Sequence, residues 1–147
     1  MNDSSLARVL AIALRPLRAQ PMMLVQAARA EREGCLVGDH SKSAKRGITL
    51  LSAPQWADVI GDLGFDLPWH TRRANVLLDA KDLGRLVGQT VRIGEVEILV
   101  NGITYPCAHI EEMQPGLLKA LTSDRGGVYG RILNDGEVRV GDEMRVM

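Results

Sequence analysis

The sequence is poor in aromatic residues and carries no net charge. Its aromatic residues are two Trp, two Tyr and one Phe. They provide few surfaces on which the bases of single-stranded nucleic acid can stack, and they make the expected core aliphatic. Its 18 basic side chains balance 18 acidic ones, which argues against a protein that follows a phosphate backbone or an anionic membrane. We therefore expect neither nucleic acid nor a membrane as a partner.

Long apolar runs are also missing. The run over residues 9–14 is far shorter than the roughly 20 residues that a membrane-spanning helix needs, and the acidic N-terminus does not resemble a secretion signal. The only cysteines, Cys35 and Cys107, are far apart in the sequence, which predicts reduced thiols and a cytoplasmic protein. Metal-binding Cys-x-x-Cys and His-x-x-x-His spacings and glycine-rich nucleotide loops are absent, so we expect neither a zinc site nor a nucleotide-driven enzyme.

The length of 147 residues, with 46% hydrophobic residues, fits one globular domain over residues 1–147. A chain of this size buries about two thirds of its surface, so its core can form without metal ions or disulfides. Many short apolar stretches with β-branched residues are separated by glycine turns, and few segments look helical. This pattern predicts a mainly β fold with a few short helices, a barrel rather than a layered α/β sheet.

The clearest single element is a helix expected over residues 54–63, because Ser52 and Gln55 form a capping box and Gly64 can end the helix. The good helix formers of residues 25–33 predict a second helix, with only a weak apolar stripe. Residues 6–14 fit both a helix face and a strand, and periodicity does not decide between them. Further strands are expected at 47–51, 74–78, 90–93 and 96–100, short helical turns at 83–87 and 115–121, and a hairpin at 128–140.

Cys107 lies in the phrase Ile-Thr-Tyr-Pro-Cys-Ala-His, where an extended chain would point Tyr105, Cys107 and His109 to the same side. A histidine beside a thiol favours the thiolate, which attacks electrophiles, carries sulfur or binds a soft metal. The alternative is that Cys107 is a small buried hydrophobic residue, as free cysteines often are. Cys35 is expected in the core.

A second group, Arg72, Arg73 and Asn75, stands at the start of an expected strand. Guanidinium groups bind phosphate through two parallel hydrogen bonds, so these residues can bind an anion; a solvated pair of surface arginines is the alternative. The turn at Asp39 and His40 places an acid beside an imidazole, but one acid and one histidine do not make a metal site.

Together these phrases resemble the MOSC family, which is named after the C-terminal domain of molybdenum cofactor sulfurases. The similarity runs in order from about residue 9 to residue 140. The phrases that carry it are Gly38-Asp39-His40, Arg46-Gly47-Ile48-Thr49-Leu50-Leu51, Arg72-Arg73-Ala74-Asn75, Leu86-Val87-Gly88 to Ile93-Gly94, Pro106-Cys107 and Arg125-Gly126-Gly127-Val128-Tyr129. The resemblance implies a closed β-barrel and makes residues 6–14 a strand.

The resemblance also implies a site for the molybdenum cofactor, molybdopterin, or for transferable sulfur. Cys107 would carry sulfur as a persulfide or ligate molybdenum, and Arg73 and Asn75 would hold the pterin phosphate or nearby backbone. The other residues expected in this pocket are Arg72, Arg46 and Thr49, and more weakly Asp39 and His40.

The chain resembles a stand-alone MOSC domain. It lacks the aminotransferase-like domain that uses pyridoxal phosphate, so pyridoxal phosphate binding belongs only to the larger family, and it lacks the N-terminal β domain of amidoxime reductases. The resemblance implies a sulfur donor such as a cysteine desulfurase, or an electron-donor reductase, as partner. Three functions stay open: a cofactor-binding or sulfur-carrier domain, a small molybdoenzyme that reduces N-hydroxylated compounds, and a non-catalytic binding or adaptor domain.

Overall fold

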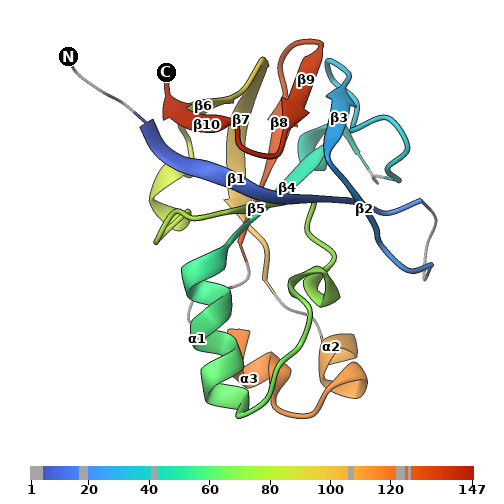
Figure 1. Cartoon of the computed structure of the whole chain (residues 1–147), viewed down its shortest axis with the longest axis vertical. Coiled ribbons are helices and arrows are strands. Elements are labelled where there is room, and N and C mark those ends of the chain that lie inside the picture. The colour runs from blue at the N-terminus through green and yellow to red at the C-terminus, as the bar shows by residue number, and fades with distance from the viewer. Residues whose placement is uncertain (1–4, 17–19, 41–42, 106–107, 122–124, 126) are drawn as a thin grey trace.

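In the computed structural model, seven strands close into a β-barrel (Figure 1). The structure describes residues 5–16, 20–40, 43–105, 108–121, 125 and 127–147. Around the barrel the order is β1 (Ser5–Leu14), β5 (Val76–Leu78), β4 (Ile48–Ser52), β8 (Val128–Ile132), β7 (Val96–Ile103), β6 (Thr90–Ile93) and β10 (Glu143–Val146), which pairs again with β1. The pair β4–β5 is parallel, and the other pairs of the barrel are antiparallel. The expected mainly β barrel is confirmed.

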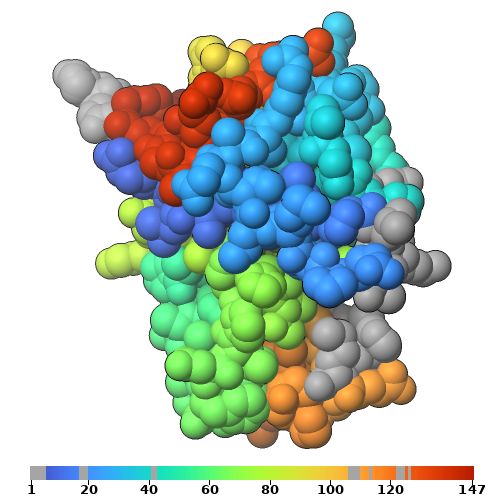
Figure 2. All heavy atoms as spheres, turned by 45° about the vertical axis from the view of Figure 1, so that its right-hand side comes forward, coloured from blue at the N-terminus to red at the C-terminus, as the bar shows by residue number. Residues whose placement is uncertain are grey.

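Strand β2 (Met23–Val25) continues the sheet beyond β1, and β3 (Ala27–Ala30) forms a separate two-stranded sheet with β9 (Gly136–Arg139). The helices α1 (Ala53–Leu63), α2 (Ala108–Met113) and α3 (Leu117–Leu121) gather at one end of the molecule, seen in green and orange at the bottom of Figure 1 and Figure 2. Three short 3-10 turns, η1 (Ala44–Arg46), η2 (Trp69–Arg72) and η3 (Gly84–Leu86), connect strands. None of the helices in the described ranges is long and apolar enough to span a membrane.

Two apolar clusters hold this arrangement together. The strands place every second side chain inside the barrel, as β7 does with Val96, Ile98 and Val100. A second cluster, which includes Leu51, Trp56 and Val59, packs the helices against the end of β4. The helical end therefore has its own core, and the barrel core is aliphatic as its composition predicts.

Helix α1 forms where local chemistry predicts it. The Ser52 hydroxyl accepts a hydrogen bond from the backbone N–H of Gln55 at 3.1 Å, and Gly64 ends the helix in the left-handed region with φ of 84°. Ser52 also donates to the carbonyl of Ala80 at 2.5 Å. The start of α1 is thus tied to the segment that leaves β5.

Two expectations about secondary structure are settled by strand pairing. Residues 6–14 lie within β1, as the family resemblance implies, because β10, β5 and β2 all hydrogen-bond to this strand. The helix expected over residues 25–33 is wrong: β2 and β3 occupy this stretch, and Ala28 and Ala30 alternate into the core. Because their apolar stripe is weak, a helix of these residues would bury little apolar surface, and pairing with other strands is favoured instead.

The hairpin expected over residues 128–140 is also wrong, although its two strands exist. Strand β8 lies between β4 and β7, and both of its edges are used by the barrel. Strand β9 therefore leaves the barrel and pairs with β3. The strands expected at 47–51, 74–78, 90–93 and 96–100 and the helical turns expected at 83–87 and 115–121 correspond to β4, β5, β6, β7, η3 and α3.

The fold predicts different costs for two alanine substitutions at glycines of almost equal φ. Gly127 (φ 96°) would place a Cβ atom 2.2 Å from the carbonyl oxygen of Leu50, whereas a Cβ on Gly141 (φ 97°) meets no described atom within 4 Å. Gly141→Ala should lower the free energy of unfolding by about 1 kcal/mol from backbone strain alone. Gly127→Ala should lower it by about 3 kcal/mol or more, because overpacking adds to strain. Urea unfolding followed by Trp fluorescence measures both, and equal losses would contradict this packing.

Candidate functional site

The side chain of Asn75, just before β5, is fully buried and joins three segments of the chain. Its carboxamide oxygen accepts hydrogen bonds from the backbone N–H (3.0 Å) and the hydroxyl (3.1 Å) of Thr49 in β4. Its amide nitrogen donates to the carbonyl of Ala13 in β1 at 3.1 Å and to Oδ1 of Asp39 at 3.2 Å. These bonds use two donors and two acceptor positions, which is the capacity of a carboxamide. Asn75 and Thr49 thus bond to each other.

Asp39 is the buried acid of this site. Its side chain is 0% exposed, and it forms an ion pair with Arg15, which follows β1 and has a side chain 21% exposed. Oδ1 accepts from the backbone N–H of Arg15 at 2.6 Å and from its Nε at 3.3 Å, and Oδ2 accepts from Nη2 at 3.0 Å. A buried carboxylate needs such partners because leaving water costs several kcal/mol. The turn at residues 38–40 is therefore fastened to the end of β1.

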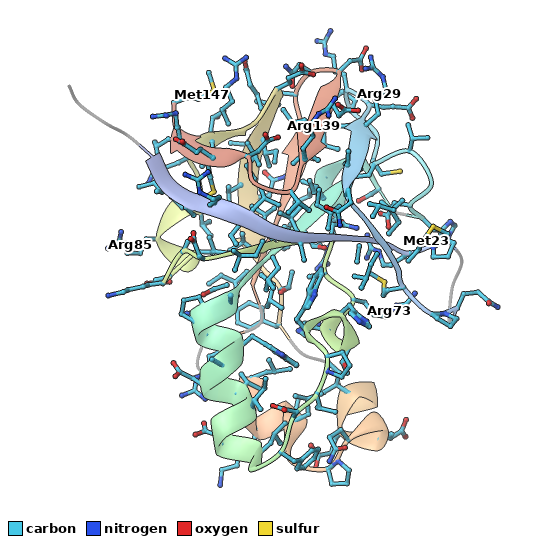
Figure 3. The ribbon with its side chains drawn as sticks, viewed as in Figure 1. Met23, Arg29, Arg73, Arg85, Arg139 and Met147 are labelled. Atoms are coloured by element: carbon cyan, nitrogen blue, oxygen red, sulfur yellow. The ribbon has the colours of Figure 1, made fainter. Side chains whose placement is uncertain are left out.

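Arg73 lies beside this ion pair. It follows η2 with φ of 62° and ψ of 31°, a left-handed conformation uncommon for a side-chain-bearing residue, and its Nη1 donates to the carbonyl of Gln20 at 2.8 Å. Figure 3 shows it between the barrel and η2, on the side of the molecule that carries Met23. Burial lowers the pKa of the Arg73 guanidinium; repulsion from Arg15 lowers it further, and attraction to Asp39 acts in the opposite direction. Both guanidiniums thus lie within electrostatic range of Asp39, which forms its ion pair with Arg15.

Arg72 connects this site to the segment before Cys107. Its Nη2 donates to the carbonyl of Thr104 at 2.9 Å, just after the end of β7. Cys107 itself lies outside the described residues. The backbone is helical from Ala108, where α2 begins, so the extended conformation assumed for this phrase does not continue through residue 109. Tyr105 is 72% exposed.

Arg46, His40 and Cys35 are the other described residues that the sequence singled out. The Arg46 guanidinium stacks 4.2 Å from the ring centroid of Tyr129, a cation–π contact. His40 is exposed next to Asp39. Cys35 is half-buried rather than in the core, with its Sγ 3.6 Å from the carbonyl oxygen of Asp39.

Sequence reasoning missed Arg15. Its partner Asp39 is 24 residues away, and no local motif marks an arginine that follows an apolar strand. Among the described residues, no group of three or more His, Cys, Asp or Glu side chains lies close enough together to hold a metal ion. What the described residues do assemble is a pair of cationic side chains, Arg15 and Arg73, beside Asp39 and Asn75. Chemically, such a group is suited to bind an oxyanion.

Comparisons with known proteins agree with this architecture. A family model described as the MOSC domain matches residues 37–145. The YuaD protein from Bacillus subtilis superimposes with a TM-score of 0.80 at 18% identity, over 95% of this chain and 94% of that one. YiiM from Geobacillus stearothermophilus gives 0.75 at 14% identity, over 96% and 75% of the two chains, and YiiM from Escherichia coli gives 0.72 at 15%, over 95% and 69%. A search of curated proteins found no significant match. Identities this low show a shared fold and assign no activity.

The Asn75 bonds predict that this residue is needed for stability. Asn75→Ala should lower the free energy of unfolding by about 3 kcal/mol, because buried donors and acceptors of Thr49, Ala13 and Asp39 lose their partner. The control is Asn101→Ala, which removes one bond to the carbonyl of Lys45 and should cost about 1 kcal/mol or less. Chemical unfolding measures both variants. Equal stability of the two would mean that the buried network contributes nothing.

Proposed function

The chain belongs to the MOSC domain family, which is associated with the molybdenum cofactor, and we propose that it is a cofactor-binding or sulfur-carrier domain. In this proposal the loop of Arg72 and Arg73 holds the phosphate of an anionic group. Cys107 then receives sulfur as a persulfide or ligates molybdenum. A sulfur donor of the cysteine desulfurase type is the partner that this chemistry needs.

The observation that carries the proposal is the position of the arginine loop. Arg73 stands beside Arg15 and within electrostatic range of Asp39, and Asp39 accepts hydrogen bonds from Arg15 and Asn75. Arg72 is bound to Thr104, three residues before Cys107 in the sequence. The loop therefore offers positive charge next to the segment that leads to the candidate nucleophile.

The side chains present fit a phosphate-bearing pterin. Arginines bind phosphate oxygens in pairs, and a rigid strand end holds them in place at little entropic cost. When bound, the molybdenum cofactor supplies two-electron redox chemistry at the metal. The chain itself would bind and orient the group through Arg73, with Asn75 keeping the strand end in position.

Sulfur carriage would use Cys107 alone. Its thiolate attacks the outer sulfur of the donor's persulfide, and a new S–S bond forms at Cys107. The S–S bond of the donor breaks, and the donor's cysteine leaves as a thiolate, so no external oxidant is consumed. Neighbouring positive charge favours this reaction because it stabilises the attacking thiolate.

Loss of Arg73 should reduce cofactor loading. In protein purified from cells that make the cofactor, Arg73→Gln should lower the molybdenum and pterin content about tenfold or more, because a charge-assisted phosphate contact is lost. Elemental mass spectrometry and pterin fluorescence measure the two contents. The control is Arg85→Gln, an exposed arginine that Figure 3 shows on the opposite side of the molecule. Equal loading of both variants would argue against a phosphate at Arg73.

Persulfide formation should depend on Cys107. After incubation with a cysteine desulfurase and cysteine, intact-protein mass spectrometry should show the wild-type chain heavier by one sulfur atom. Cys107→Ser should lose this species, and Cys35→Ser, at the other cysteine of the chain, should keep it. Circular dichroism checks that both variants are folded. If no variant gains sulfur and all carry molybdenum, Cys107 is not a sulfur carrier; if sulfur remains in Cys107→Ser, the wrong residue has been assigned.

A further inference from the structure

Strand β2 is the last strand of its sheet, and in the described part of the chain β1 is its only strand neighbour. The side chains of Met23 and Leu24 are 52% and 58% exposed, although both are large and apolar. Figure 3 shows Met23 at the periphery of the molecule. Successive side chains of a strand point to opposite faces of the sheet, so both faces of this edge are open to solvent.

The direction of the backbone groups of Leu24 follows from the bonds of the residue opposite it. Leu24 stands opposite Ala13 of β1 in an antiparallel pair. The N–H of Ala13 donates to the carbonyl of Asn75 at 2.7 Å, on the side away from β2, so Ala13 and Leu24 do not exchange hydrogen bonds. The N–H and C=O of Leu24 therefore point outward from the sheet. Within the described part of the chain, neither group has a hydrogen-bond partner.

This edge lacks the features that keep a strand edge from pairing with another strand. Natural edges are protected by charged side chains, by proline within the strand or by a bulge. Residues 21–28 carry no charged side chain, and Pro21 precedes β2 rather than interrupting it. The pairing of β2 with β1 is regular over all three of its residues. An unpaired, uncharged edge of this kind is a template for a further strand.

A second copy of the same strand fits this edge. In antiparallel pairing about a two-fold axis at Leu24, each Leu24 donates its N–H to the carbonyl of the other, so both outward groups are used. Met23 then lies opposite Val25 of the second copy on one face, and the two Leu24 side chains meet on the other. Residues 21–27 face residues 21–27 of the second copy, so no like charges oppose each other.

We propose that β2 is the contact between two copies of this chain, which pair antiparallel through Leu24 and extend the sheet across a two-fold axis. The contact is independent of the proposed function, because it uses none of the residues assigned to the cofactor or to sulfur. Since β2 has only three residues, the paired edge is short, and the dimer is weak and depends on protein concentration.

Sedimentation velocity over about 0.01–1 mM protein tests the proposal. The wild-type chain should shift from monomer to dimer within this range. Leu24→Lys should raise the dissociation constant of the dimer at least about tenfold, because two ammonium groups would meet at the two-fold axis. The matched control is Leu10→Lys, since Leu10 is also large, apolar and exposed but lies outside the part of β1 that pairs with β2. This control should dimerise like the wild type.

Leu24→Pro tests the backbone contact. It removes the outward N–H, which no bond to β1 uses, so circular dichroism should show a folded chain while the dissociation constant rises at least about tenfold. Amide hydrogen exchange measured by NMR locates the contact without a substitution: exchange of the Leu24 N–H should slow as the dimer forms. If Leu24→Pro does not fold, Leu24→Lys and the exchange measurement decide.

Three results would overturn the proposal. A wild-type chain that stays monomeric up to about 1 mM leaves the edge to a strand of another protein. A dimer that persists in Leu24→Lys, or that is lost equally in Leu10→Lys, uses another surface. Exchange of the Leu24 N–H that does not change on dimerisation excludes pairing through β2.

Discussion

Four hydrogen bonds converge on the buried carboxamide of Asn75, and they connect β4, the end of β1 and the turn that carries Asp39. None of these partners is near Asn75 in the sequence, so the bonds form only when β1, β4 and the turn of Asp39 are brought beside the start of β5. Leaving a buried amide without hydrogen-bond partners lowers the free energy of unfolding more than the loss of one ordinary hydrogen bond does. The network therefore favours one arrangement of these strand ends. The barrel and the candidate site depend on the same interaction.

The charges of the site follow from this constraint. Asp39 is buried because its turn is drawn against Asn75 and the end of β1, and burial of a carboxylate requires a cation, which Arg15 supplies. Arg73, two residues before Asn75, is then held beside an ion pair that is already complete. The guanidiniums of Arg15 and Arg73 are thus held at neighbouring strand ends, each within electrostatic range of Asp39.

Prediction from sequence succeeded where the determining forces are local. Helix α1 has its cap residue, its glycine end and its apolar face within one short segment, so each is visible in the sequence. The helix predicted for residues 25–33 does not form because strand pairing with β1 and β9 outweighs the helix propensity of these residues. The hairpin at 128–140 failed because β8 already has a neighbour on each side, which no local pattern reveals.

The sequence by itself determined the aliphatic composition of the core, the short apolar segments of a barrel and the helix expected at residues 54–63, and it singled out Arg72, Arg73 and Asn75. Tertiary structure alone decided that Asn75 bonds inward to Thr49, that Asp39 is buried, and that Arg15 stands beside Arg73. The physical reason is the distance along the chain over which each kind of interaction acts. Caps, turns and apolar periodicity act over a few residues, whereas these hydrogen bonds and charges act between atoms that only the pairing of distant strands brings together.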